Sequence, residues 1–307
     1  MILLMKLISV VLIIVPVLVN VAFITLLERK ILGYSQMRLG PNKVSYIGFL
    51  QPFSDALKLL SKEYFALFSS NTMLFYLSPI FSFIIVLMLW FMYPMALSSL
   101  SFKYSLLLLL MIMSFSVYPV LLSGWASNSK YAMLGGMRSV AQTISYEISF
   151  AFILMTLMLM NMTVNLESSI GSLNMFSVVM VFPLILVMWL VVCLAESNRT
   201  PFDFAEGESE LVSGFNVEYG AGGFTLIFLS EYASIYFLSA LTSLLLFKLS
   251  PSMILSWMVS TMFVFFWVWA RTTLPRFRYD LLMSLAWKSI LPSSLLFLEM
   301  VSTMMVI

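Results

Sequence analysis

The chain has 307 residues, of which 62% are hydrophobic and only 10% are charged, with a formal net charge of +2 and a mean hydropathy of +1.03. These values exclude an ordinary soluble globular domain and indicate a protein that crosses a membrane several times. With no histidine and one cysteine, Cys193, the sequence excludes internal disulfides, cysteine-ligated iron–sulfur clusters and histidine-ligated haem or zinc. We therefore expect no metal site. We also expect no nucleic-acid partner.

Eight apolar segments are long enough to cross a bilayer, because a hydrocarbon core of ~30 Å takes about 20 helical residues. Continuous apolar runs favour helices over barrel strands, which alternate in polarity. The expected fold is an all-α polytopic membrane protein, one membrane domain over residues 1–307. The expected spans are Ile2–Leu27, Met73–Met95, Tyr104–Leu122, Val140–Met160, Met175–Leu194, Gly220–Phe247, Met253–Ala270 and Leu281–Val301.

A short amphipathic helix is predicted over residues 51–64, after a loop rich in glycine and proline. Its apolar positions recur at helical spacing and its charged positions lie opposite: Phe53, Ala56, Leu57, Leu60 and Tyr64 against Asp55, Lys58 and Lys62. Such a helix is expected to lie in the membrane interface. The alternative is a simple surface anchor.

Glycines mark two further positions. The polar loop Trp125–Arg138 contains Gly135-Gly136, which we interpret as a hinge. Gly220-Ala-Gly-Gly223 opens the sixth span, where small residues weaken the helix and allow close backbone approach.

An acidic loop is expected over residues 195–219. It holds one cation, Arg199, and the carboxylates Glu196, Asp203, Glu206, Glu208, Glu210 and Glu218. Thr200 and Pro201 predict a helix start, which would put Asp203, Glu206 and Glu210 on one face, where repulsion raises the pKa of carboxylates. The alternative is a solvated acidic loop, but the loop also carries phenylalanines that favour apolar surroundings.

Three ionisable residues fall inside apolar spans, where a charge is costly: Glu147, Glu231 and Lys288. The carboxylates follow or precede a tyrosine, as Tyr146-Glu147 and Glu231-Tyr232. These pairs suggest a hydrogen-bonded proton relay. The alternative is that each charge pairs with a neighbour to orient helices.

Most lysines and arginines lie in the loops after spans 1, 3, 5 and 7. The positive-inside rule places those loops on the cytoplasm-equivalent side, which in a mitochondrion is the matrix. Both termini are then expected on the opposite side.

Several stretches, nearly the whole chain in register, resemble membrane subunit 1 of respiratory complex I, NADH:ubiquinone oxidoreductase, in an arthropod mitochondrial form. They are Glu28-Arg-Lys-Ile-Leu-Gly-Tyr34, Arg38 with Gly40-Pro-Asn42, Gln51-Pro-Phe-Ser-Asp-Ala-Leu-Lys58, Ala141-Gln-Thr-Ile-Ser-Tyr-Glu147 and Glu196–Tyr219. The chain departs from the family pattern at Leu39, where a lysine is usual, and at Ser284, where histidine is common.

The resemblance implies a subunit that walls a ubiquinone tunnel and couples quinone reduction to proton translocation. By position it implies tunnel residues Arg29, Arg38, Phe53, Arg199, Asp203, Glu206 and Phe228. It also implies a proton-coupling path of Tyr146, Glu147, Glu196, Asp203, Glu206, Glu208, Glu210, Glu218, Glu231 and Tyr232.

The resemblance further implies the mitochondrial inner membrane, with long loops in the matrix and both termini in the intermembrane space. Ubiquinone is the expected substrate, while FMN and iron–sulfur clusters belong to partner subunits of the peripheral arm. Small membrane subunits and lipids are further expected partners, and the isolated chain is expected to have no activity and no catalytic residue. The alternatives are a free-standing proton or cation antiporter and a purely structural hinge subunit.

Overall fold

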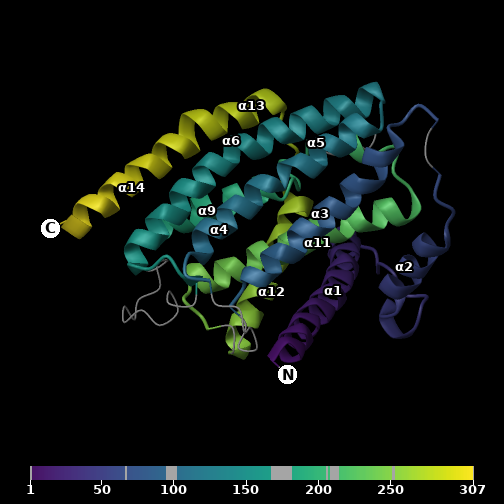
Figure 1. Ribbon diagram of the computed structural model, residues 1–307, viewed down its shortest axis with the longest axis horizontal. Coiled ribbons are helices and arrows are strands. Elements are labelled where there is room, and N and C mark those ends of the chain that lie inside the picture. Colours follow the sequence, from purple (N-terminus) through teal and green to yellow (C-terminus); the bar gives the residue numbers. More distant parts are fainter. Residues whose placement is uncertain are drawn as a thin grey trace.

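A computed structural model describes residues 2–65, 68–94, 102–166, 182–204, 207, 214–250 and 253–306. Every regular element in these ranges is helical, which confirms the all-α class (Figure 1). Within them, seven spans are long and apolar enough to cross a membrane. They are α1 (Ile2–Ser35), α3 (Thr72–Met92), α4 (Ser105–Phe115) with α5 (Val117–Ala126), α6 (Lys130–Asn161), α11 (Ala221–Leu245), α12 (Ile254–Thr273), and α13 (Tyr279–Leu285) continuing through η3 (Ala286–Ile290) into α14 (Leu291–Val306).

The expected eighth span, Met175–Leu194, is represented only by α9 (Pro183–Glu196). With 14 residues, this helix is shorter than a bilayer crossing requires. The first part of the expected span lies outside the described residues. The count of eight spans therefore stays a prediction.

Two helices extend well beyond their expected ends. α1 continues past Leu27 to Ser35, and α6 begins at Lys130 rather than Val140. The added turns carry charged residues, Glu28, Arg29 and Lys30 on α1 and Lys130 and Arg138 on α6. Hydropathy marks only the part of a helix that suits hydrocarbon. The extension of α1 is important because it keeps Glu28 and Arg29 on a regular helix.

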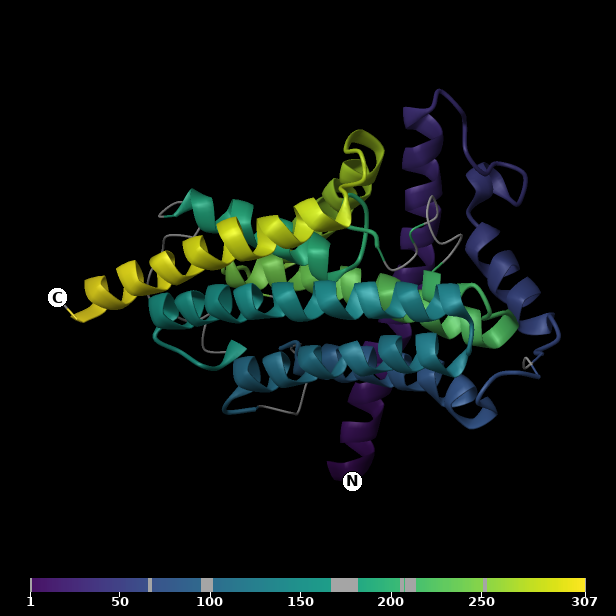
Figure 2. The same cartoon turned by 90° about the horizontal axis from the view of Figure 1, so that it is seen from above.

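α11 is the central helix. It packs against α1, α3 and α12, and among the spans it is the most buried. α6 and α14 lie side by side, while α1, at the purple end of the colour scale, crosses the other long helices steeply (Figure 2). Most side chains on α11 are therefore held in the interior of the bundle.

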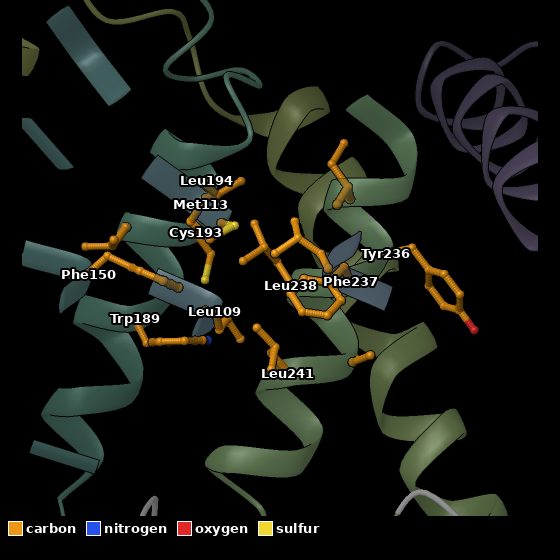
Figure 3. Packing of buried hydrophobic residues seen from close by; sticks show 14 of the residues in the cluster. Leu109, Met113, Phe150, Trp189, Cys193, Leu194, Tyr236, Phe237, Leu238 and Leu241 are labelled. Atoms are coloured by element: carbon orange, nitrogen blue, oxygen red, sulfur yellow. The ribbon is translucent and has the colours of Figure 1, made fainter. Parts of the chain in front are cut away.

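The main apolar core joins α4, α6 and α9 to α11. The rings of Phe150 and Trp189 stack with centroids 5.1 Å apart, and Figure 3 shows this group facing Leu238 and Leu241 of α11. The thiol of Cys193 is fully buried in the same cluster. These buried contacts hold α9 in place, together with the polar residues at its end.

The hinge interpretation of Gly135-Gly136 is wrong. Both residues lie inside α6, where a Cβ on Gly135 would be 2.9 Å from the Cα of Gly214, and one on Gly136 would be 3.4 Å from the Cα of Gly124. These glycines let α5 and the short helix η2 (Gly214–Asn216) pack against α6 at backbone distance.

α2 (Gln51–Ser61) confirms the short helix after the first span, three residues shorter than expected. It packs against α1 and α11, and its Phe53 and Leu57 side chains are exposed. The interfacial position of α2 stays a prediction.

The start of α11 is fixed by aromatic packing. Tyr219 stacks on Phe75 with centroids 4.3 Å apart, and its hydroxyl lies 2.9 Å from the hydroxyl of Ser78. Burial raises the pKa of Tyr219 to about 12, so it stays protonated at neutral pH. A Cβ on Gly223 would be 2.7 Å from the side-chain hydroxyl of Tyr64, whereas one on Gly220 or Gly222 would have nothing within 4 Å, so no close backbone approach is seen at these glycines.

Candidate functional site

The end of α9 places a carboxylate at the centre of the bundle. α9 stops because Asn198 adopts a left-handed conformation (φ 49°), and Glu196 is the last helical residue. From α6, the Gln142 side chain donates to the carbonyls of Ala195 (2.9 Å) and Phe202 (2.7 Å). Gln142 thus holds both the helix end and the following turn in place.

A cavity of about 100 Å³ opens beside Glu196. Two carboxylates line it, Glu196 and Glu231 of α11, and its other polar lining consists of hydroxyls and one amide: Ser82, Ser116, Thr143, Ser197, Asn198, Ser230 and Ser234. Among the described residues, one oxygen of Glu196 and the amide oxygen of Asn198 are buried without a hydrogen-bond partner. The rest of the wall is apolar: Val86, Leu89, Met113, Val120, Phe215 and Leu238. The polar groups give water molecules hydrogen-bond partners in a space of this size.

Glu147 is adjacent to this cavity. It lies four residues after the cavity-lining Thr143, on the same face of α6. The carboxylates of Glu147 and Glu196 are close enough to repel each other. Glu147, Glu196 and Glu231, which are far apart in the sequence, therefore form one acidic group with water-sized space between helices.

The tyrosines next to Glu147 and Glu231 do not pair with them. The Tyr146 hydroxyl donates to the carbonyl of Leu282 at 3.2 Å, and the Tyr232 hydroxyl donates to Glu28 at 2.5 Å. Consecutive residues on a helix point about 100° apart, so they cannot share a hydrogen bond. The expected relay within each pair is wrong.

A cluster of charges joins α1, α11 and α12 on the other side of Tyr232. Glu28 forms an ion pair with Arg271, and Arg199 forms one with Glu231 at 3.3 Å. The guanidinium carbon of Arg199 also lies 4.5 Å from the centre of the Tyr232 ring. The expected site residues Arg199, Glu231 and Tyr232 thus meet, together with Glu28 and Arg271, for which no role was expected.

A signal for Glu28 is present in the sequence. Val17, Val21, Ile24 and Glu28 follow helical spacing, and in the structure all are buried on one face of α1. A charged residue that continues a buried stripe must find partners in the interior. Lys288, the third ionisable residue expected within a span, is instead exposed.

The end of α1 carries a second hollow, of about 480 Å³, lined by Arg29, Arg38 and the intervening turn. Arg29 pairs with Asp55 of α2 at 2.5 Å, which ties α2 to α1. Lys30 points inward and donates to the Asn42 side chain at 2.7 Å. The two arginines expected to line a tunnel therefore line the same hollow.

Aromatic side chains lie on α1 and on the two helices that pack against it, α2 and α11. The ring of Phe53 lies 6.0 Å from that of Phe23 on α1. On α11, Phe228 contacts Phe224 at 4.2 Å and Tyr232 at 6.3 Å between ring centroids. Phe228 therefore continues the face that Tyr232 presents to Glu28.

The acidic loop differs from its expectation. Residues 200–204 form turns, so no helix begins at Thr200 in the part of the loop that is described, and Gln142 rather than a capping box holds the turn. Asp203 is buried, pairs with Arg276 at 3.2 Å and does not line the cavity. Glu218 is half-buried before α11, whereas Glu206, Glu208 and Glu210 lie outside the described residues.

Comparisons with known proteins agree along nearly the whole chain. A family model described as NADH dehydrogenase matches residues 8–302, which include all the side chains of the cavity and of the charge cluster. The chain belongs to the NADH dehydrogenase family. The resemblance seen in the motifs is thereby confirmed.

Members of the NADH dehydrogenase family with high similarity share one name. The chain is 53% identical to NADH-ubiquinone oxidoreductase chain 1 of Aedes aegypti, over 96% of this chain and 94% of that one. The protein of the same name from Locusta migratoria is 51% identical over 94% of this chain and 91% of that one. The one from Sarcophilus harrisii is 47% identical over 94% of this chain and 93% of that one.

Proposed function

We propose that the chain is the core membrane subunit of a proton-pumping NADH:ubiquinone oxidoreductase, a multi-pass protein of the mitochondrial inner membrane. The names of its relatives support membership of that complex. In this function the chain walls the path by which ubiquinone enters and couples its reduction to proton movement. FMN and the iron–sulfur clusters are held by partner subunits of the peripheral arm, with the long loops in the matrix and both termini in the intermembrane space.

One observation carries the coupling part of the proposal: Glu196 and Glu231 line the same water-sized cavity, with Glu147 beside it. Carboxylates inside a bundle are costly unless they serve an ion or proton pathway. Serine and threonine hydroxyls between them can accept and donate, and water in the cavity can connect the acids. The three carboxylates can therefore exchange a proton, or respond to each other's charge.

The quinone part of the proposal is supported by the second hollow. Arg29 and Arg38 present two cations, and the aromatic rings of Phe53 and Phe228 lie on the neighbouring α2 and α11. A hollow with a few polar groups, and with apolar and aromatic side chains on the adjacent helices, suits an isoprenoid quinone. Reducing the quinone takes up two protons, so the acids near its path would change their charge with each turnover.

The test is Glu196→Gln in the assembled complex, with NADH:quinone activity and proton pumping measured in the same vesicles. Glutamine keeps the size and removes the exchangeable proton, so we expect pumping to fall about tenfold or more. The matched control is Glu299→Gln, which neutralises an exposed carboxylate on α14 and should change neither rate. Normal coupled pumping by the Glu196 variant would overturn the coupling role and leave a structural hinge subunit.

A further inference from the structure

Gln142 is a buried amide on α6 whose hydrogen bonds reach both ends of one short segment. Its Nε2 donates to the carbonyl of Ala195, in the last turn of α9, at 2.9 Å, and to the carbonyl of Phe202 at 2.7 Å. None of the surface of Gln142 is exposed. A single nitrogen therefore closes the segment 196–201 between the end of α9 and the turn that follows.

The backbone bonds of this segment are local. The N–H of Asn198 donates to Ala195 at 3.3 Å, and the N–H of Phe202 donates to Arg199 at 2.8 Å. Each of these bonds joins residues three apart, so it forms one turn and does not fix how the two turns lie relative to each other. The Gln142 amide supplies that restraint, because its two N–H groups leave one nitrogen in fixed directions.

The same segment carries three residues of the acidic cavity, which is the space of about 100 Å³ lined by Glu196 and Glu231. They are Glu196, Ser197 and Asn198. Among the described residues, one carboxylate oxygen of Glu196 is buried without a hydrogen-bond partner. The direction of this carboxylate therefore depends on the backbone that carries it, and a displacement of about 1 Å is enough to impair a reacting group.

We propose that Gln142 is a positioning residue for Glu196, which holds the end of α9 so that this carboxylate faces the acidic cavity. Gln142 does not itself line the cavity, whereas the next residue, Thr143, does. The amide therefore acts through the backbone of the segment 196–201. The inference rests on the proposed function, because it deepens the role that Glu196 has there. It adds a residue for which the sequence predicted no role.

The test is a double-mutant cycle in the assembled complex, with Gln142→Met, Glu196→Gln and the double variant Gln142→Met/Glu196→Gln. Methionine has about the size of glutamine but no N–H group to donate. We expect Gln142→Met to lower the number of protons pumped per electron about threefold or more, while the KM for quinone stays within about twofold. The double variant should match Glu196→Gln within about 1.5-fold, because an effect that acts through Glu196 disappears once its carboxylate is gone.

Thr156→Val is the matched control. Thr156 is also buried on α6, but its hydroxyl donates to the carbonyl of Ile153 in the same helix at 2.6 Å. Valine removes this buried bond without releasing α9, so the number of protons pumped per electron should stay unchanged. An equal loss in Thr156→Val, or losses that multiply in the double variant, would overturn the proposal, since Gln142 would then support the bundle in general and not Glu196.

If Gln142→Met fails to assemble, Gln142→Asn takes its place in the same cycle. Asparagine keeps both N–H groups but is shorter by one carbon–carbon bond, and the same two results of the double variant support or overturn the proposal. Glu196→Gln alone separates the two proposals. Normal pumping by Glu196→Gln refutes the proposed function, whereas lost pumping there with normal pumping by the variant at Gln142 refutes this inference alone.

Discussion

Replacing Arg276 by leucine is expected to destabilise the subunit by about 3 kcal/mol, because it removes a charged partner of a buried carboxylate. Asp203 has a side chain only 4% exposed and pairs with Arg276 at 3.2 Å. Without the guanidinium, the buried Asp203 loses this charged contact, and we expect the turn at residues 200–204 to move with it. The measurement is the amount of assembled complex on native gels, together with its midpoint of thermal unfolding in detergent.

Two further variants decide the cause of this effect. Arg278→Leu, only two residues away, breaks the ion pair between Arg278 and Asp280, whose side chains are 80% and 73% exposed respectively. This variant should lose less than about 0.5 kcal/mol of stability. Asp203→Leu/Arg276→Leu removes both charges and should recover most of the lost stability. Equal losses for Arg276→Leu and the double variant would show that the charge of Asp203 is not responsible.

Changing Gly135 to alanine is expected to have the second largest effect, a loss of about 1–3 kcal/mol from overpacking. The added methyl group would lie 2.9 Å from the backbone of Gly214, which cannot move aside as a flexible side chain can. Either α6 or the turn before α11 must shift. The midpoint of thermal unfolding of the complex should fall, and the acidic loop should become more sensitive to protease.

Gly222→Ala is the matched control for Gly135→Ala. Gly222 also lies in a helix, but a Cβ there has nothing within 4 Å. Because alanine has a higher helix propensity than glycine, this variant should be neutral or slightly more stable. A midpoint for Gly135→Ala as high as that of Gly222→Ala would show that the backbone contact carries no stability.

The fold class followed from the sequence because it depends on total apolar length, which composition and continuous runs measure directly. The helix ends could not be predicted in this way. The turns of α1 beyond Leu27 and of α6 before Val140 carry charges and glycines, and they contact other segments of the chain. The Gly135-Gly136 pair was misread for the same reason. A glycine that permits close packing and a glycine that permits bending look alike until the neighbouring backbone is known.

The candidate site was predicted in part. The resemblance selected Glu147, Glu196 and Glu231, and the structure brings them together. Spacing along the chain misassigned the tyrosine pairs, because adjacency in sequence is not adjacency in space on a helix. Asp203 was assigned to the same acidic group, but its partner is Arg276, which is 73 residues away and follows α12. Such pairings depend on how helices cross, which a single sequence does not specify.

Because Glu231 and Tyr232 are consecutive on α11, that helix separates two polar regions by the thickness of one helix. The carboxylate faces the acidic cavity, and the phenol faces α1. An α-helix is about 10 Å across with its side chains, so a charge that changes on one side is felt on the other without any movement of the backbone. The residue register of α11 is therefore strictly constrained. A single residue inserted or deleted in α11 before Glu231 would turn all later side chains by about 100°. Glu231 would then no longer face the acidic cavity, and Tyr232 would no longer face α1.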